Sequence, residues 1–160
     1  MITHDLRLIA DAMIDKKAEK VVSLDLRSIG GAITDFFMVC DGSNTTQVGA
    51  IADNIAEKMK EEGHTLYRSQ GEGNNFWIIQ DYGNIVVHIF LKEYRDFYRL
   101  EELWADVPRK EYKERKHHVR AGDSMYSIAQ KYGIRLKSLY KMNHLSPDYN
   151  LRIGDQLKLR

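Results

Sequence analysis

The sequence has one cysteine, two prolines and no long apolar run. The single cysteine, Cys40, excludes an intrachain disulfide, and its place in the stretch FFMVC predicts a buried thiol that packs as a small apolar side chain. The low proline content and the mixed composition argue against a disordered or collagen-like chain. No apolar segment is long enough to cross a bilayer, and acidic residues interrupt the N-terminal stretch where a secretory signal would be apolar. We therefore expect a cytoplasmic protein without a membrane partner.

Signals for catalysis are also missing. The turn at Gly42-Ser43, between a strand and a helix, most resembles a phosphate loop, but no Walker lysine and no Asp-x-Asp pair follows it. A plain strand-to-helix turn capped by Asn44 or Thr45 is the favoured interpretation. The six histidines are scattered, without HExxH or Cys/His spacing. We expect no catalytic residues, no metal site and no cofactor.

The charges divide the chain in two. Residues 1–115 contain 15 Lys and Arg against 20 Asp and Glu, a net charge of −5, whereas residues 116–160 contain 9 against 3, a net charge of +6. A length of 160 residues with 43% hydrophobic content allows one full core and a small second one. Two units with different surfaces are therefore expected.

Hydrophobic periodicity in the first part predicts the order helix, strand, strand, helix, three strands and one or two short helices. A long helix between strands implies a crossover connection, and the turn DYGN implies an antiparallel hairpin. We expect a mixed α/β fold with a five-stranded mixed sheet and flanking helices. The five strands are expected at residues 20–27, 35–42, 64–69, 76–80 and 85–91.

A second, smaller pattern follows. The stretch PRKEYKERKHH, residues 108–118, predicts a solvated linker in which His117 and His118 are exposed. After it come a short strand, a helix with Asp123 as N-cap and Gly133 at its end, a second helix at 136–142, a loop and a closing strand. We place the domains at residues 1–112 and 117–160, with 113–116 as a charged linker.

Aromatic residues stand out on the last two strands of the first part. Trp77, Asp81, Tyr82, His88 and Phe90 lie along adjoining strands and the turn between them. Aromatic rings mixed with a few polar groups are typical of a protein-binding hot spot. Two alternatives remain: Trp77 and Phe90 fill the core, or the rings stack on single-stranded nucleic acid, although the acidic charge of this part would repel phosphates.

The stretches DFFMVCDGSNTTQVGAIADNI, WIIQDYGNIVVHIF and YRDFYRLEELWADVP, in this order and spacing, resemble the ribosomal silencing factor family (RsfS, also called Iojap-like) over residues 1–112. The resemblance implies a nucleotidyltransferase-like fold without catalytic carboxylates, and a non-enzymatic repressor of translation. It would bind large-subunit ribosomal protein uL14 and block joining of the small subunit. Homodimerisation of the free protein through the same aromatic face is also expected. The partner-binding residues that the resemblance implies are Trp77, Asp81, Tyr82, His88, Phe90, Arg95, Tyr98 and Trp104.

The stretch VRAGDSMYSIAQKYGIRLKSLYKMNHL and the later IGDQLKL resemble the LysM module over residues 117–160. This resemblance implies a βααβ fold that binds glycans containing N-acetylglucosamine in a groove between two loops. Loop backbone groups would bond the acetamide, and Met125 would contact its methyl group. The implied glycan-binding residues are Gly122, Asp123, Ser124, Met125, Leu145, Ser146, Pro147, Asp148, Tyr149, Asn150 and Leu151.

The two resemblances imply different compartments, since ribosomes are cytoplasmic and peptidoglycan lies outside the membrane. Three explanations stay open: the LysM module lost glycan binding and acts as a spacer or partner-binding tail, it engages cytoplasmic cell-wall precursors or turnover products, or the chain is an unusual or artificial fusion. The first part decides the expected function, which is ribosome silencing. The alternatives are a glycan-binding protein that uses the first part as a scaffold and, more remotely, an enzyme on a nucleotidyltransferase-like fold.

Overall fold

The computed structural model describes residues 2–159 and forms two compact units, residues 1–113 and 114–160. No helix in the described part is long and apolar enough to span a bilayer. Unit 1 contains, in chain order, α1 (Ile2–Asp15), β1 (Glu19–Asp25), β2 (Phe36–Gly42), α2 (Thr45–Glu61), β3 (Arg68–Gln70), β4 (Trp77–Asp81), β5 (Ile85–Leu91), α3 (Lys92–Tyr98), the 3-10 helix η1 (Leu100–Trp104) and β6 (Arg109–Glu111).

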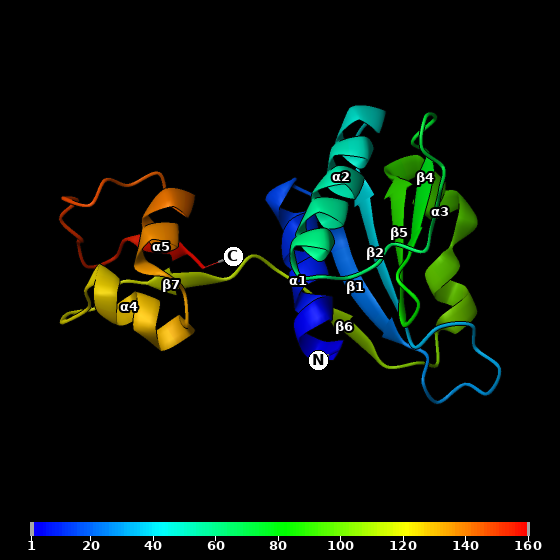
Figure 1. Cartoon of the computed structure of the whole chain (residues 1–160), viewed down its shortest axis with the longest axis horizontal. Coiled ribbons are helices and arrows are strands. Elements are labelled where there is room, and N and C mark those ends of the chain that lie inside the picture. The colour runs from blue at the N-terminus through cyan, green and yellow to red at the C-terminus, as the bar shows by residue number, and fades with distance from the viewer. Residues whose placement is uncertain (1, 160) are drawn as a thin grey trace. The chain divides into compact units, whose positions relative to one another are not determined.

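Unit 1 is a mixed sheet between two layers of helices. The strand order is β3-β4-β5-β2-β1-β6, and only β2 and β5 pair in parallel; every other neighbouring pair is antiparallel. The parallel pair follows from the long α2 crossover, and the β4–β5 hairpin follows from the short turn. Helices α1 and α2 cover one face of the sheet, and α3 lies on the other (Figure 1).

Alternation along β2 supplies a core to each face. Phe36, Met38 and Cys40 pack against α1 and α2, whereas Phe37 and Val39 point to the opposite face. This alternation explains why the strand is buried over its whole length. The prediction of a buried Cys40 is confirmed, and burial raises the pKa of its thiol.

The sheet has six strands, so the predicted number of five is wrong. The sixth, β6, lies inside the segment that we predicted to be a solvated linker, and it pairs with β1 at the sheet edge. The side chains of β6 are all charged, so the strand has no hydrophobic pattern by which the sequence could reveal it. An edge strand can lack such a pattern because backbone hydrogen bonds to its neighbour hold it in place. Tyr112 follows it into the core, 7% exposed, where its hydroxyl lies 3.2 Å from Ser23 Oγ.

The turn at Gly42-Ser43 is a helix cap. Asn44 is the N-cap of α2, and its side chain accepts a hydrogen bond of 2.8 Å from the Gln47 backbone N–H. Gln47 Oε1 in turn accepts the Ser43 N–H at 2.7 Å. Two of the turn's free donors are therefore satisfied within the turn, which agrees with the favoured interpretation of it.

Unit 2 contains β7 (Lys116–His118), α4 (Met125–Tyr132), α5 (Leu136–Met142) and β8 (Gln156–Lys158), so its order is βααβ. Strands β7 and β8 pair antiparallel. Its small core is apolar and continuous; the fully buried members are Val119, Met125, Ile128, Ala129, Leu139, Leu157 and Leu159.

Two predictions about unit 2 are wrong. His117 is buried, because its ring hydrogen-bonds at both nitrogens: Nδ1 lies 2.7 Å from Tyr132 Oη, and Nε2 lies 2.9 Å from Asp123 Oδ2. The N-cap of α4 is Ser124, which forms a capping box with Ser127. Asp123 instead accepts hydrogen bonds from His117 and from the Arg120 N–H. The first of these bonds is the main reason why its pKa is lowered.

Candidate protein-binding surface

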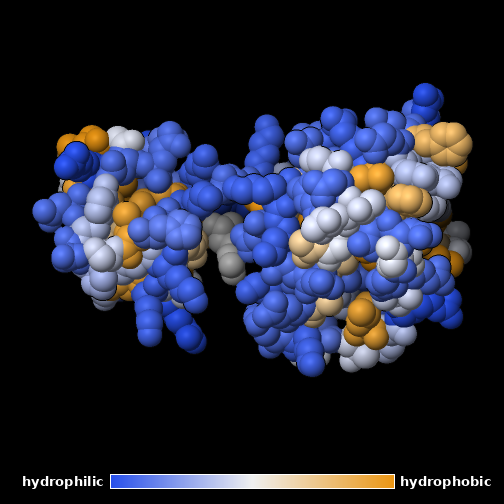
Figure 2. Space-filling model, turned by 90° about the horizontal axis from the view of Figure 1, so that it is seen from above, coloured by the Kyte–Doolittle hydropathy of each residue, from blue (hydrophilic) through white to orange (hydrophobic). Residues whose placement is uncertain are grey.

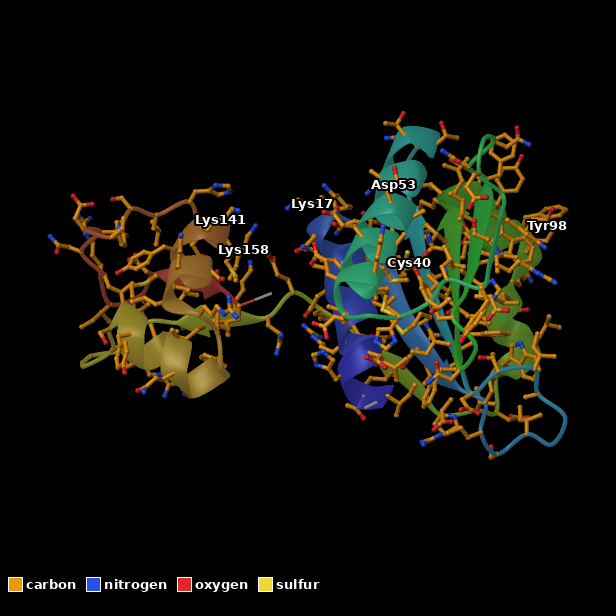
Figure 3. All side chains as sticks on the ribbon, in the orientation of Figure 1. Lys17, Cys40, Asp53, Tyr98, Lys141 and Lys158 are labelled. Atoms are coloured by element: carbon orange, nitrogen blue, oxygen red, sulfur yellow. The ribbon has the colours of Figure 1, made fainter. Side chains whose placement is uncertain are left out.

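Five aromatic side chains form a continuous surface where β4 meets α3. Phe76 stacks on Tyr94 with ring centroids 4.8 Å apart, and Tyr98 lies 4.9 Å from Trp77 and 5.2 Å from Phe97. Phe97 is 77% exposed and Tyr98 47% exposed. Figure 3 shows Tyr98 on the outer side of α3, away from the sheet. We call Phe76, Trp77, Tyr94, Phe97 and Tyr98 the aromatic surface; such a cluster is typical of an interaction site.

Trp77 is fixed from below by two residues of β5. Phe90, fully buried, stacks against its indole at 4.8 Å, and the indole N–H donates a 3.1 Å hydrogen bond to His88 Nδ1. Since an indole can only donate, His88 Nδ1 must be unprotonated for this bond. Burial also lowers the pKa of His88 to about 4. The orientation of Trp77 therefore depends on a neutral His88.

We predict that acid weakens unit 1 through His88. The folded pKa of about 4 lies below the usual 6.5, so the unfolded chain binds the proton first, and stability is lost as the pH falls from 6.5 towards 4. The loss from this group is about 3 kcal/mol. Both tryptophans lie in unit 1, so urea unfolding followed by tryptophan fluorescence at pH 7 and pH 4 measures it.

The variant His88→Gln keeps an acceptor for Trp77 but has no group that titrates in this range. It should lose about 3 kcal/mol less than the wild type on acidification. The exposed His4→Gln is the control and should retain the wild-type acid dependence. An acid loss in His88→Gln equal to that of the wild type would show that His88 does not set it.

Arg95 of α3 is the centre of a buried charge network. Its Nη1 donates to Asp41 Oδ2 at 3.1 Å and to the Lys20 carbonyl at 2.7 Å, and its Nε donates to Glu101 Oε1 at 2.7 Å. Arg109 contacts the other Glu101 oxygen at 2.9 Å. These bonds tie α3 and η1 to β1, β2 and β6. Arg95 therefore holds the helix that carries most of the aromatic surface.

Four of the eight residues predicted to bind the partner are buried: Tyr82, His88, Phe90 and Arg95. Tyr82 belongs to the core on the α1 and α2 side, opposite to Trp77, so the hairpin turn does not present its ring to a partner. The other three support the aromatic surface from beneath. In this structure none of the four offers a side chain for direct contact, which corrects the expectation of one exposed aromatic strand pair.

The remaining four predicted residues are at least partly exposed. Trp77 and Tyr98 lie together in the aromatic surface. Trp104 of η1 packs against the core on the same face of the sheet, with its ring 6.0 Å from Phe37. Asp81 stands apart at the other end of β4, about 13 Å from Trp77 at the rise of a strand, and its Oδ1 accepts the Gly83 N–H of the turn at 2.8 Å.

The sequence-based list missed Phe76, Tyr94 and Phe97. The spacing of Tyr94, Phe97 and Tyr98, three and four residues apart on a helix, could have revealed that they share one side of α3. Phe76 could be found only from the fold. The pairing of β4 with β5 brings it next to Tyr94, which lies just after β5 in the chain.

A charged groove of about 880 Å³ lies beside α3 and the β6 edge. Five basic and four acidic side chains line it, so its charge is nearly balanced and does not favour a phosphate ligand. No cluster of three or more metal-ligating side chains occurs within residues 2–159. The described part of unit 1 thus offers the aromatic surface as its candidate binding site.

Unit 2 contains two turns with the same hydrogen-bond pattern. The first overlaps the first predicted glycan loop, and the second directly follows the loop 145–151. In RAGD, residues 120–123, and RIGD, residues 152–155, the aspartate Oδ2 accepts the N–H of the arginine three residues earlier, at 2.8 and 3.1 Å. Gly122 and Gly154 have φ of +88° and +94°, which strongly favours glycine. The carboxylates of Asp123 and Asp155 are therefore engaged in holding these turns.

The predicted glycan residues differ in exposure. Met125 is 5% exposed and belongs to the core, so the expectation that it contacts an acetamide methyl is wrong for this structure. The loop residues 146–150 are exposed, and Leu145 and Leu151 pack partly against the same core. Gly122 and Ser124 are exposed at the first turn, beside the engaged Asp123.

The fold and the surface together define a mixed α/β binding domain followed by a small βααβ module. The model of the family described as "Ribosomal silencing factor during starvation" matches residues 2–133, and the LysM domain model matches residues 117–160. The chain therefore belongs to the RsfS family, whose members are ribosome regulators and not enzymes, and it carries a LysM domain. The two matches overlap over 117–133; the compact units separate at Lys113, which places that stretch in unit 2.

Individual relatives support the assignment. The chain is 42% identical over 103 residues to ribosomal silencing factor RsfS of Halalkalibacterium halodurans, covering 64% of this chain and 87% of the relative. It is 38% identical over 103 residues to RsfS of Bacillus subtilis, covering 64% and 86%. A crystal structure of a Bacillus halodurans protein matches with a TM-score of 0.61 and 38% identity, covering 69% of this chain and 99% of that one. One of a Chromobacterium violaceum protein matches with a TM-score of 0.63 and 28% identity, covering 77% and 97%.

Proposed function

We propose that residues 1–112 bind the large ribosomal subunit through ribosomal protein uL14 and sterically block joining of the small subunit, which represses translation. The observation that carries the proposal is the aromatic surface on a domain of the RsfS family. The surface has the composition of an interface core: stacked aromatic rings, with Trp77 already fixed before binding. Preorganised aromatic anchors lose little side-chain entropy on association.

The mechanism needs no chemical step. The bound domain covers a surface of the large subunit that the small subunit must contact. The domain and the small subunit therefore compete for that surface. The strength of silencing then follows from the affinity and concentration of the chain, by mass action. Exposed aromatic rings on the free protein also provide a contact for homodimerisation, and ribosome binding would compete with it.

Sedimentation with purified subunits tests the proposed binding. The chain should pellet with isolated large subunits at concentrations at which it stays in the supernatant with isolated small subunits. Pelleting with both alike, or with neither, would contradict the proposal.

The LysM domain supports a second candidate function, binding of a glycan that contains N-acetylglucosamine. The match over residues 117–160 favours it, with the exposed loop 146–150 as the contact region. Full-length protein should then be retained on chitin or peptidoglycan beads, and the loop variant Tyr149→Ala should be retained less. Retention equal to that of an unrelated basic protein at the same salt concentration would exclude this function.

A further inference from the structure

The two units carry opposite charge. Residues 114–160 contain ten Lys and Arg against four Asp and Glu, a net charge of +6, whereas residues 1–113 have a net charge of −5. Figure 2 shows the surface of the smaller body mostly in the hydrophilic colour, with long polar side chains projecting from it. The N-acetylglucosamine sugar itself is uncharged, so contact with the sugar does not require this excess of cations.

Three of the cations lie on or next to α5. Leu139 is its buried residue, and Lys137 and Lys141 lie two positions to either side of it, so both project from the opposite face of the helix. Arg135 precedes the helix and is exposed. Within the described residues, none of these three basic side chains forms an ion pair.

Two further cations lie on the sheet. Lys116 of β7 and Lys158 of β8 are directly opposite each other, an arrangement that is destabilising without compensation. They share a single carboxylate: Glu114 lies 3.7 Å from Lys116 Nζ and 3.5 Å from Lys158 Nζ. Within residues 2–159 one positive charge of this pair therefore has no carboxylate of its own.

Asn143 joins the helix that carries the first three cations to the strand that carries Lys158. Asn143, at the end of α5, accepts the Lys158 N–H at 2.7 Å and donates to the Lys158 carbonyl at 3.1 Å. Figure 3 labels Lys141 on α5 and Lys158 on this neighbouring strand. We call Lys116, Arg135, Lys137, Lys141 and Lys158 together the basic surface; it takes in the outer side of α5 and the solvent side of the two strands, and with Glu114 included its net charge is +4.

We propose that the basic surface binds the phosphate backbone of RNA and tethers the chain to the ribosome. The inference rests on the proposed function, because it is ribosome binding by unit 1 that brings the attached module next to RNA. Unit 1 is acidic and gains nothing from phosphates, so the module supplies the attraction that unit 1 lacks. A second contact on the same chain can raise the overall affinity by roughly 10²-fold to 10⁴-fold.

The direct test uses the full chain and a fluorescent single-stranded RNA of mixed sequence. Anisotropy titrations at several salt concentrations should give an affinity that falls with salt, with a logarithmic slope of about −3 for four neutralised phosphates. The variant Arg135→Gln, Lys137→Gln, Lys141→Gln should bind weakly and reduce the slope by about 2. These side chains are exposed, so the fold should be retained.

The matched control removes three exposed lysines of unit 1, Lys16→Gln, Lys60→Gln and Lys92→Gln. It should bind the RNA as well as the wild type or better, because unit 1 becomes still more acidic. Equal RNA binding by the α5 variant and the wild type would overturn the proposal. So would a wild type that ignores RNA but binds a soluble N-acetylglucosamine oligomer, which would assign unit 2 to glycans.

Loss of the tether and loss of the proposed function are distinguishable. Changes in the aromatic surface should reduce binding to large subunits to the weak level that the basic surface alone gives, and should leave binding to the RNA oligonucleotide intact. The α5 variant should still sediment with large subunits at low salt, at least 10-fold more weakly than the wild type. If the α5 variant binds large subunits as tightly as the wild type, the tether does not operate on the ribosome.

Discussion

The double variant Trp77→Ala, Tyr98→Ala is expected to lose sedimentation with the large ribosomal subunit. The two rings lie 4.9 Å apart at the centre of the aromatic surface, and Tyr98 is substantially exposed. Removing a central aromatic anchor commonly costs about 2 to 4 kcal/mol of binding free energy, which is roughly a 30-fold to 1000-fold loss in affinity. The loss should appear in binding curves measured by pelleting with a fixed amount of large subunits.

The control for this variant is Tyr126→Ala, the same truncation at an exposed tyrosine of unit 2. It should bind large subunits like the wild type. Because Trp77 packs on Phe90, circular dichroism must show that the double variant is folded. Tyr98→Ala alone leaves the Trp77 ring in place and should still weaken binding about 10-fold. If the folded double variant binds as tightly as the wild type, the aromatic surface is not the interface.

Replacing Arg95 by methionine is expected to destabilise unit 1 by about 3 to 5 kcal/mol. The Asp41 side chain is 2% exposed and would lose its only ion-pair partner in the described part of unit 1, while Glu101 would keep Arg109. An unpaired buried carboxylate is costly because water no longer solvates it. Urea unfolding followed by tryptophan fluorescence measures the loss for unit 1 alone, since unit 2 contains no tryptophan.

The pH dependence of this loss has a definite sign. Burial already raises the pKa of Asp41, and Arg95 opposes that rise. Without Arg95 the folded pKa lies still further above the unfolded one, so the variant becomes less stable as the pH rises through that range. Its deficit against the wild type should therefore shrink towards pH 4. The second change Asp41→Asn, which removes the buried charge, should restore part of the stability.

Arg109→Gln is the matched control, since Arg109 contacts the same Glu101 but its side chain is 45% exposed. It should cost less than about 1 kcal/mol, because exposed ion pairs contribute little. An Arg95→Met variant within 1 kcal/mol of the wild type would mean that the buried network does not hold α3 in place.

The order of elements in unit 1 followed from the sequence because its strands and long helices carry strong apolar patterns. The strand Arg109–Glu111 was missed for the opposite reason: its three side chains are charged, and only pairing with β1 makes it a strand. The prediction that His117 is exposed failed because it, too, depends on tertiary contacts. Its burial depends on Tyr132 and Asp123, which come from other elements and could not be paired with it beforehand.

The candidate site was only partly predictable. Alternation along β4 and β5 identified Trp77 and its neighbours, but it could not show which of these side chains are buried. The packing of α3 on the sheet decides this, and it also decides which side of α3 is exposed: Arg95 is buried, whereas Phe97 and Tyr98 are exposed. The expected function came from the resemblance to a family and not from any site chemistry.

Light scattering of mixed ribosomal subunits tests the silencing mechanism most directly. Large subunits are incubated with saturating full-length chain, small subunits are added, and the joined fraction is measured. The proposed competition predicts that joining falls with increasing chain, and that the Trp77→Ala, Tyr98→Ala variant leaves it unchanged. Undiminished joining while the chain saturates the large subunit would contradict a steric block.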